Sequence, residues 1–330
     1  MRAQVCYPLS FQRNKGFGNL QAASEHRWRT EMSAELDICI PFFNDDPVAL
    51  IDELAQQTSQ TRHRLSLCDD GSCRPELTAR VIAALERYPG PAALYTLSRN
   101  TGRANARNVA LHKTHCDWVL LLDADMSLDR PDFIEIYKQA ARRFDHPCCI
   151  VGGFRVDLTD VRPHNLLHAA QSRKSECKPA AQRARDPGKH VYSSSIFVHR
   201  SILARHVFDP EFQAWGWEDV EWGWRIVQDY PIHHIDNPSR HRGLDEDRVL
   251  IRKYAESDEN FRRIRQLYPE KVVRMPIARV SYILSWLPFQ HHLGTLFQRV
   301  AMFARLPVVL RLYALKLYRA SRYAWVYDDG

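Results

Sequence analysis

The sequence of 330 residues lacks several features that would assign it to a class at once. None of its eight cysteines forms a CxxC pair, and no zinc-binding or disulfide pattern connects them. The N-terminus has no apolar stretch typical of a signal peptide, so we expect a protein of the reducing cytosol. The stretch from Val280 to Gln298 is free of formal charge, but polar residues and Pro288 interrupt it. A bilayer span needs about 20 mainly apolar residues, so this stretch is expected to be interfacial or packed.

Charge is unevenly distributed along an otherwise ordinary composition. With 45% hydrophobic and 26% charged residues the chain is globular, which excludes disordered, collagenous and coiled-coil proteins. The net charge is +7, and residues 272–330 carry +6 of it, from eight basic and two acidic residues. The remainder is close to neutral, which argues against a nucleic-acid partner and indicates a basic tail on a near-neutral body.

Short apolar runs alternate with segments of helical periodicity after residue 35. Such alternation predicts an α/β fold with a mostly parallel, Rossmann-like sheet covered by helices on both faces. We expect a loose extension over residues 1–34, a catalytic domain over 35–271 and a helical tail over 272–330. The expected strands are 36–42, 64–68, 92–97, 118–122 and 148–154, and the expected helices are 47–57, 76–88, 102–112 and 131–144.

Acidic residues follow two of these strands directly. Ligands of parallel sheets bind at the carboxyl ends of the strands, where Asp69-Asp70 and Asp123-Ala124-Asp125 are expected. In an extended chain Asp123 and Asp125 point the same way, so their carboxylates converge and favour a cation, Mg²⁺ or Mn²⁺, that holds a diphosphate. The alternative is structural: Asp123 caps the strand, Asp125 caps the next turn, and Asp69-Asp70 form an ordinary turn.

Arg103 and Arg107 lie four residues apart in the predicted helix 102–112, so they share one face of it. They could face a phosphate or a solvated surface, and the sequence leaves both alternatives open.

Four of the eight tryptophans lie in the segment 215–224, with Glu218 and Asp219 between them. Aromatic rings bind the C–H faces of sugars, so Trp215, Trp217 and Trp222 are predicted to form a sugar platform. An apolar setting raises the pKa of a carboxylate toward that of a useful base. The alternative is a helix start, since acids there favour the helix dipole.

The motifs IPFFN, DDGS, RNTGRANARN, LLLDAD and WGWEDVE, in this order, resemble those of family 2 glycosyltransferases of the GT-A fold. The resemblance covers Leu36 to about Arg242. The WGWEDVE segment is similar to that of polypeptide N-acetylgalactosaminyltransferases, chondroitin-type polymerases and β-1,4-galactosyltransferases. Two features depart from the family pattern. Cys73-Arg74 stands where Thr-Asp is usual, and the basic segment 157–190 matches no family motif, at the position of a variable acceptor loop.

The resemblance implies an inverting transferase that uses a nucleotide sugar, a UDP-sugar by expectation, with Mn²⁺ or Mg²⁺ as cofactor. It assigns the nucleotide pocket, the metal and the acceptor hydroxyl to different side chains. On the donor side, Pro41 and Phe42 would border the nucleotide, and Asp69 or Asp70 would contact uracil. Asp123 would contact ribose or the metal, and Asp125 would ligate the metal. On the acceptor side, Asp219 would be the general base and Glu218 would bind a hydroxyl. His241 is either a further metal ligand or a structural residue.

Other functions remain open at this point. A retaining transferase carries similar motifs, and a non-catalytic adaptor could bind glycans or a membrane surface through the tryptophans and the tail. A nucleotidyltransferase usually needs a glycine-rich phosphate loop, and IPFFND has no glycine. The expected acceptor is a glycan or lipid-linked molecule of bacterial surface polysaccharide or glycolipid synthesis.

The segment 308–324 is roughly amphipathic, with Arg311, Lys316, Arg319 and Arg322 on one arc. This pattern predicts a basic helix that docks peripherally on the anionic inner membrane face. The alternative is a helical hairpin that packs on the catalytic core or on another subunit.

Overall fold

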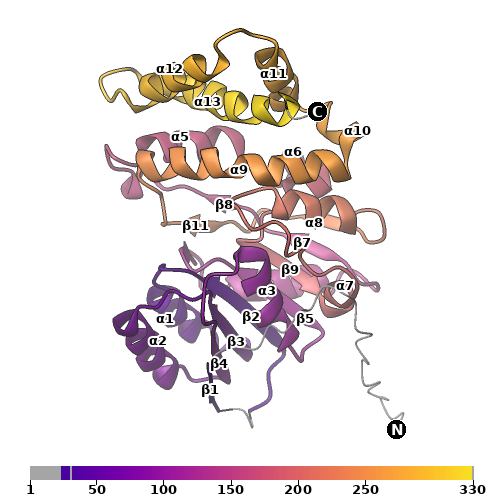
Figure 1. Cartoon of the computed structure of the whole chain (residues 1–330). Coiled ribbons are helices and arrows are strands. Elements are labelled where there is room, and N and C mark those ends of the chain that lie inside the picture. The colour runs from indigo at the N-terminus through magenta and orange to yellow at the C-terminus, as the bar shows by residue number, and fades with distance from the viewer. Residues whose placement is uncertain (1–23, 30–31, 329–330) are drawn as a thin grey trace.

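The computed structural model describes residues 24–29 and 32–328, and a mixed β-sheet runs through it (Figure 1). The strand order is β1-β4-β3-β2-β5-β9-β7-β10. Strands β4, β3, β2 and β5 are parallel, β9 is antiparallel to both β5 and β7, and β10 is parallel to β7. In chain order these strands are Ser24–Trp28 (β1), Leu36–Phe42 (β2), His63–Asp69 (β3), Ala92–Thr96 (β4), Trp118–Leu122 (β5), Cys149–Val151 (β7), Ser195–His199 (β9) and Ile232–His234 (β10).

The described helices cover the two faces of this sheet and extend beyond its β10 edge. Those before β9 are Val48–Gln57 (α1), Pro75–Arg87 (α2), Arg103–His112 (α3), Phe133–Ala141 (α4), Leu166–Ser175 (α5) and Ala180–Arg183 (α6). Those after it are Arg200–Arg205 (α7), Glu218–Ile226 (α8), Asp247–Leu267 (α9), Pro269–Val272 (α10), Pro276–Ser285 (α11), Gln290–Met302 (α12) and Val308–Asp328 (α13).

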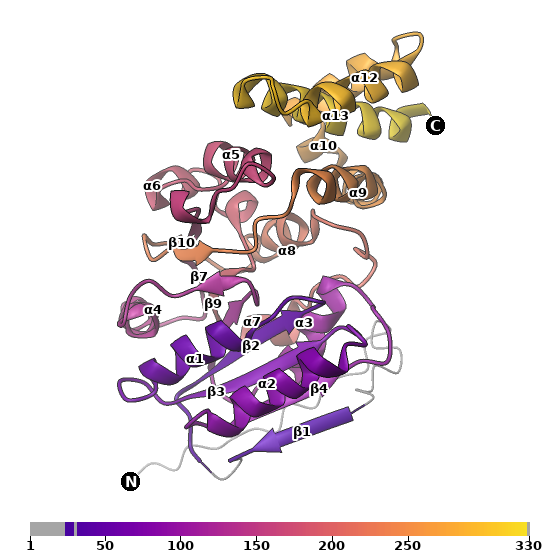
Figure 2. The same cartoon turned by 90° about the vertical axis from the view of Figure 1, so that its left-hand side faces the viewer.

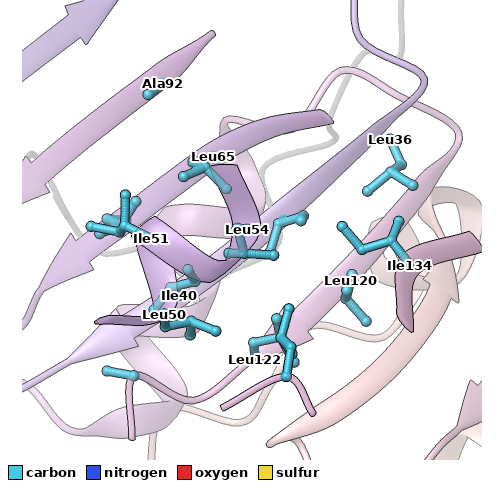
Figure 3. Close-up of a cluster of buried hydrophobic side chains, with 14 of the residues drawn as sticks. Leu36, Ile40, Leu50, Ile51, Leu54, Leu65, Ala92, Leu120, Leu122 and Ile134 are labelled. Carbon is cyan, nitrogen blue, oxygen red and sulfur yellow. The ribbon is translucent and has the colours of Figure 1, made fainter. Parts of the chain in front are cut away.

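Alternate residues of the central strands enter two different hydrophobic cores. Ile38 and Ile40 of β2 face the core under α1, α2 and α4, whereas Cys39 faces the core under α3. Figure 3 shows the first core, in which Leu50, Ile51 and Leu54 of α1 lie over the strands. Because both faces are buried, the strands are continuous apolar runs, and the predicted α/β class follows from that. Cys39 is fully buried in this second core.

Two expectations about strands differ from the structure. Ser24–Trp28 lies within the expected loose extension but forms an edge strand antiparallel to β4. Its side chains are mostly exposed, so its sequence carries no apolar signal. The expected strand 148–154 is divided, because Gly152-Gly153 separates β7 from Phe154–Arg155 (β8), with Gly153 at φ 79°. Strand β8 joins a small second sheet with Met126–Ser127 (β6) and Ser239–His241 (β11).

The C-terminal helices form a separate layer. Figures 1 and 2 show α11, α12 and α13 at the end of the molecule opposite β1, with α5 and α9 between them and the sheet. Within residues 24–29 and 32–328, no helix is both long enough and apolar enough to cross a bilayer.

The predicted basic arc of the tail does not face solvent. Arg311 is buried and pairs with Asp247 of α9, and Arg322 pairs with Asp258 at 2.6 Å. The Lys316 Nζ atom donates to Ser175 Oγ at 3.3 Å. Three of the four cations of this arc therefore contact α5 and α9, which agrees with the alternative that the tail packs on the catalytic core.

Candidate active site

Three adjoining cavities extend from the carboxyl ends of β2, β3 and β5 to the C-terminal helices. The sheet-edge cavity, of about 340 Å³, is lined by residues that follow these strands. The central cavity, of about 130 Å³, borders Asp123, Asp125 and Asp219. The tail cavity, of about 570 Å³, extends from Glu218 and Asp219 to α11 and α13. Arg103 and Trp215 line all three, so the cavities form one connected site.

Pro41, Phe42 and Asp70 line the sheet-edge cavity, as expected for a nucleotide pocket. Asp70 accepts hydrogen bonds from the backbone N–H and hydroxyl of Thr101 at 2.8 and 2.7 Å and from the Gly102 N–H at 2.9 Å. Burial raises the pKa of Asp70, and these hydrogen bonds oppose that effect.

Asp69 is only 1% exposed, and its Oδ1 accepts a hydrogen bond from the Ser72 N–H at 2.9 Å. The structure therefore places Asp70 in the wall of this cavity and uses the Asp69 carboxylate to shape the turn. The predicted contact of Asp69 with a nucleobase does not fit this position.

The two arginines of α3 differ in their surroundings. Arg107 is 1% exposed, and its guanidinium lies 3.0 Å from Asp123, 3.3 Å from Glu218 and 3.4 Å from Asp219. Its charge is therefore shared among three carboxylates from different parts of the chain, and Arg107 also lines the sheet-edge cavity, as expected for a residue of the nucleotide pocket. The side chain of Arg103 is 45% exposed and lies 4.0 Å from Asp123, so its guanidinium can still reach a phosphate.

Asp125 and His241 form a pair at the boundary of the sheet-edge and central cavities. The Asp125 Oδ2 atom lies 3.1 Å from His241 Nε2, while Asp125 Oδ1 is buried without a hydrogen-bond partner. Burial raises the pKa of Asp125, but the charge and hydrogen bond of His241 outweigh burial and lower it to about 2. Gly243 packs so closely on this carboxylate that a Cβ there would collide with it.

These residues fit a cation site in which the protein supplies only part of the ligands and a bound phosphate supplies the others. Among the residues with described positions, no three His, Cys, Asp or Glu side chains converge as a metal site. Mg²⁺ sites commonly use one or two carboxylates together with substrate phosphates, which is what Asp125, with its unpaired oxygen, offers. His241 already contacts Asp125, and Asp123 is turned toward Arg107.

Glu218 and Asp219 begin α8, directly after a strained stretch of backbone. Gly216 and Trp217 both have positive φ, 83° and 77°, and a tryptophan in this region is uncommon. Strain of this kind is concentrated at functional sites because the surrounding structure must hold it. The turn directs both carboxylates toward Arg107 and leaves the Asp219 side chain 25% exposed.

Asp219 stands between the central and tail cavities and lines both. Its Oδ2 accepts a hydrogen bond from the Ser193 N–H at 3.2 Å. Burial raises the pKa of Asp219 to about 6, with Glu218 and Asp123 adding to the shift and Arg107 opposing it. A carboxylate of this pKa is ionised at neutral pH and is a stronger base than an ordinary aspartate.

The predicted tryptophan platform is only partly present. Trp215 is half-buried and lines all three cavities, and Trp217 lines the tail cavity while packing on Phe261 and Tyr323. Trp222 is fully buried, stacks on Phe208 with a centroid distance of 4.7 Å and donates its Nε1–H to the His206 carbonyl. Trp222 is therefore a core residue, because the helical period turns it away from the cavities.

Several residues of the site cannot be identified individually from the sequence. Ser193 positions Asp219 through its backbone, which no residue type reveals. Lys178, Lys189 and Lys316 line the tail cavity, and only the folded chain brings the first two, from the segment after α5, close to the third, from α13. The basic composition of residues 157–190 was the available clue.

Comparisons with known proteins agree with this architecture. Residues 37–207, just over half of the chain, match the profile of Glycosyl transferase family 2. An N-acetylglucosaminyltransferase of Neorhizobium galegae is 33% identical over 96 residues, which cover 28% of this chain and 22% of that protein. Another, of Rhizobium sp. (strain N33), is 26% identical over 157 residues, covering 44% and 33%. The chain thus spans at most a third of the length of these relatives.

Solved structures share the fold at low sequence identity. The mannosyltransferase PcManGT from Pyrobaculum calidifontis, in complex with GDP-Man and Mn²⁺, has a TM-score of 0.53 and 15% identity, covering 91% of this chain and 89% of that one. S. aureus TarS 1-349 in complex with UDP has a TM-score of 0.51 and 14% identity, covering 89% and 90%.

These solved structures share the arrangement of this sheet, and the prediction of a GT-A fold is confirmed. The chain belongs to glycosyltransferase family 2.

Proposed function

We propose that this chain transfers a sugar from a UDP-sugar to an acceptor hydroxyl with inversion at the anomeric carbon, in a metal-dependent reaction. The observation that carries the proposal is the position of Asp219, a carboxylate with a raised pKa between the central and tail cavities. The N-acetylglucosaminyltransferase relatives and the UDP complex of TarS make UDP-N-acetylglucosamine the first donor to test.

The donor would occupy the sheet-edge cavity. Its nucleotide would lie beside Pro41, Phe42 and Asp70, with Asp123 near the ribose, and its diphosphate would extend toward Asp125. Arg103, which borders each of the three cavities, would contact the diphosphate. Asp125, with His241 beside it, would hold Mn²⁺ or Mg²⁺, which supplies positive charge to the departing diphosphate.

The acceptor would approach from the tail cavity. Asp219 removes the proton from its hydroxyl while the oxygen attacks the anomeric carbon, and the bond from that carbon to the diphosphate oxygen breaks. The products are the glycoside, UDP and a protonated Asp219. Glu218 binds a hydroxyl, and Trp215 and Trp217 offer ring faces to a sugar. The resemblance of the WGWEDVE segment to segments of other glycosyltransferases supports these roles.

Arg107 is a positioning residue in this scheme. Its ion pairs with Asp123, Glu218 and Asp219 hold the donor-side and acceptor-side carboxylates at fixed separation. Without this cation three carboxylates would repel one another in a partly buried space, which is costly.

We further propose a role at a membrane surface, with 35–271 as the catalytic domain and 272–330 as an appendage on the cytoplasmic face. The contact differs from the one expected from the sequence, because α13 uses its cations internally. Exposed apolar side chains instead cluster at α11 and the turn after it: Tyr282, Ile283, Trp286, Leu287 and Phe289. Exposed Arg274 and Arg279 accompany them, which suits an anionic lipid surface. An acceptor for bacterial surface polysaccharide or glycolipid synthesis would be presented there.

The decisive experiment measures UDP release from UDP-N-acetylglucosamine and other nucleotide sugars, with Mn²⁺ or with excess EDTA. Release that requires the metal and Asp125 supports the proposal. Full activity in EDTA would remove the metal from the reaction, and no release from any nucleotide sugar would favour a non-catalytic adaptor. NMR of the product distinguishes inversion from retention by the anomeric configuration.

A further inference from the structure

The tail cavity carries more positive charge than its role as a hydroxyl site requires. Four cations line it on the side of α13: Lys178, Lys189, Lys316 and Arg319. Of the carboxylates in its lining, Glu218 and Asp219 already share Arg107, so Glu176 alone faces these cations. Charges in a partly buried cavity are normally paired, so the excess indicates an anionic ligand.

The lysines have few partners within the protein. Among the described residues, Lys178 and Lys189 form no ion pair, and the one hydrogen bond of Lys316 goes to the neutral Ser175 hydroxyl. Burial lowers the pKa of Lys316, and the charges of Lys174 and Lys178 lower it further, while Tyr313 and Glu176 oppose the shift, so repulsion from these lysines is only partly compensated within the protein. A bound anion would relieve that repulsion.

Arg319 is held by aromatic rings rather than by an acid. Its guanidinium carbon lies 4.7 Å from the centroid of Tyr254, 5.3 Å from Tyr323 and 5.6 Å from Trp215. Its Nε donates to the Tyr323 hydroxyl at 2.7 Å, and within the described part of the chain it forms no ion pair. Its other nitrogens remain able to donate to a ligand in the cavity that it lines.

We infer that the tail cavity binds an acceptor that carries a phosphate group close to the hydroxyl that receives the sugar. The inference rests on the proposed function, because Asp219 marks where that hydroxyl lies. Several donors on one wall suit a phosphate, which presents multiple acceptor oxygens. The donor diphosphate is not the anion concerned, since its proposed position is at Asp125, in the sheet-edge cavity. Ile277, Val280 and Leu317 line the same cavity and would accommodate an apolar part of the acceptor.

The test measures binding by tryptophan fluorescence, because Trp215 and Trp217 line the cavity. The protein is saturated with UDP and Mg²⁺ to fill the donor site and is then titrated with glycerol or glycerol 3-phosphate. A second pair, dihexanoylglycerol and monomeric dihexanoyl phosphatidylglycerol, asks whether the phosphate must be part of a lipid. We expect the phosphate-bearing member of at least one pair to bind at least ~10-fold more tightly.

Lys178→Gln and Lys316→Gln should each weaken binding of that probe by roughly tenfold, and Lys113→Gln, at the far end of α3, is the matched control. UDP binding is measured for every variant, and two separate lysine variants guard against misfolding of either one. Equal binding of the probes with and without phosphate, or binding unaffected by both lysine substitutions, would overturn the inference. Since metal-dependent UDP release is scored separately, that result would leave the proposed transferase activity intact.

Discussion

Replacing Asp219 with Asn tests the chemistry most directly, because it removes the base and keeps the shape. The amide oxygen can still accept the Ser193 N–H, which lies 3.2 Å from Asp219 Oδ2. Loss of a general base typically lowers the rate by about 10²–10⁴-fold. We therefore expect UDP release from the productive donor to fall by at least ~100-fold, with the Kd for UDP nearly unchanged because Asp219 does not line the sheet-edge cavity.

The pH dependence adds an independent check. Burial raises the pKa of Asp219 to about 6, so the carboxylate is protonated below that pH and cannot accept a proton. The rate should rise with pH and level off above 7, and at pH 5 it should be roughly tenfold below the plateau. If Asp219→Asn released UDP at a near-normal rate, or kept the same rise with pH, another group would be the base.

The raised pKa of Asp219 also affects the stability of the fold, which should fall with rising pH while the rate rises. A carboxyl whose pKa is higher in the folded than in the unfolded protein favours folding while it is protonated, and this contribution is lost as the pH rises from about 4 to 6. Asp219→Asn should therefore unfold at a higher temperature than the wild type at pH 7, by an equivalent of about 3 kcal/mol, and the difference should shrink toward pH 4. Asp132→Asn, whose side chain is 45% exposed and pairs with Arg130, is the control and should change neither rate nor stability.

Three further substitutions test other parts of the site. Arg107→Met leaves three carboxylates without their shared cation and should destabilise the fold by about 3–5 kcal/mol in urea unfolding; a wild-type midpoint would contradict this view of Arg107. Asp125→Asn should raise the Mn²⁺ concentration for half-maximal UDP release by at least ~10-fold, and an unchanged metal requirement would exclude Asp125 as the ligand. Trp222→Ala should cost about 3–5 kcal/mol of stability, whereas Trp215→Ala should mainly reduce transfer; the reverse pattern would restore Trp222 to the sugar platform.

The order of strands and helices could be predicted from the sequence because the central strands are buried on both faces. Leu36–Phe42 and Trp118–Leu122 are continuous apolar runs, and their limits agree with the prediction. The strand Ser24–Trp28 gave no such signal, since an edge strand with mostly exposed side chains is stabilised by its backbone pairing with β4. The hydrophobic pattern of a sequence predicts a strand when the strand is buried, because burial selects apolar residues. It does not predict a strand that is held mainly by backbone hydrogen bonds to its neighbour.

The site residues divide in a similar way. The sequence predicts Asp125 and Asp219 as site residues because each places a charged carboxylate next to apolar residues, Asp125 after a buried strand and Asp219 among tryptophans. The error at Trp222 concerns direction, because the helical turn directs this side chain into the core although its neighbours in the sequence line the cavities. Arg107 does line the sheet-edge cavity, but the sequence does not reveal its ion pairs with Asp123 and with Glu218 and Asp219, which lie more than 100 residues away. A motif in the sequence therefore shows which segment lies near the site, but it does not show which way each side chain of that segment points.

The basic tail illustrates how the same charge can serve two purposes. The excess of positive charge in residues 272–330 predicts, from the sequence alone, a basic helix that lies on a lipid surface. In the folded chain Arg311 and Arg322 fasten α13 to α9 by ion pairs with Asp247 and Asp258, which accounts for two of the cations structurally. Lys316 and Arg319 line the tail cavity beside Asp219, on the wall where the acceptor would lie. In the proposed scheme the tail therefore completes the acceptor side of the site. Removing residues 272–330 should abolish binding of the acceptor, measured by tryptophan fluorescence, and should leave the Kd for UDP nearly unchanged, because no residue of the tail lines the sheet-edge cavity.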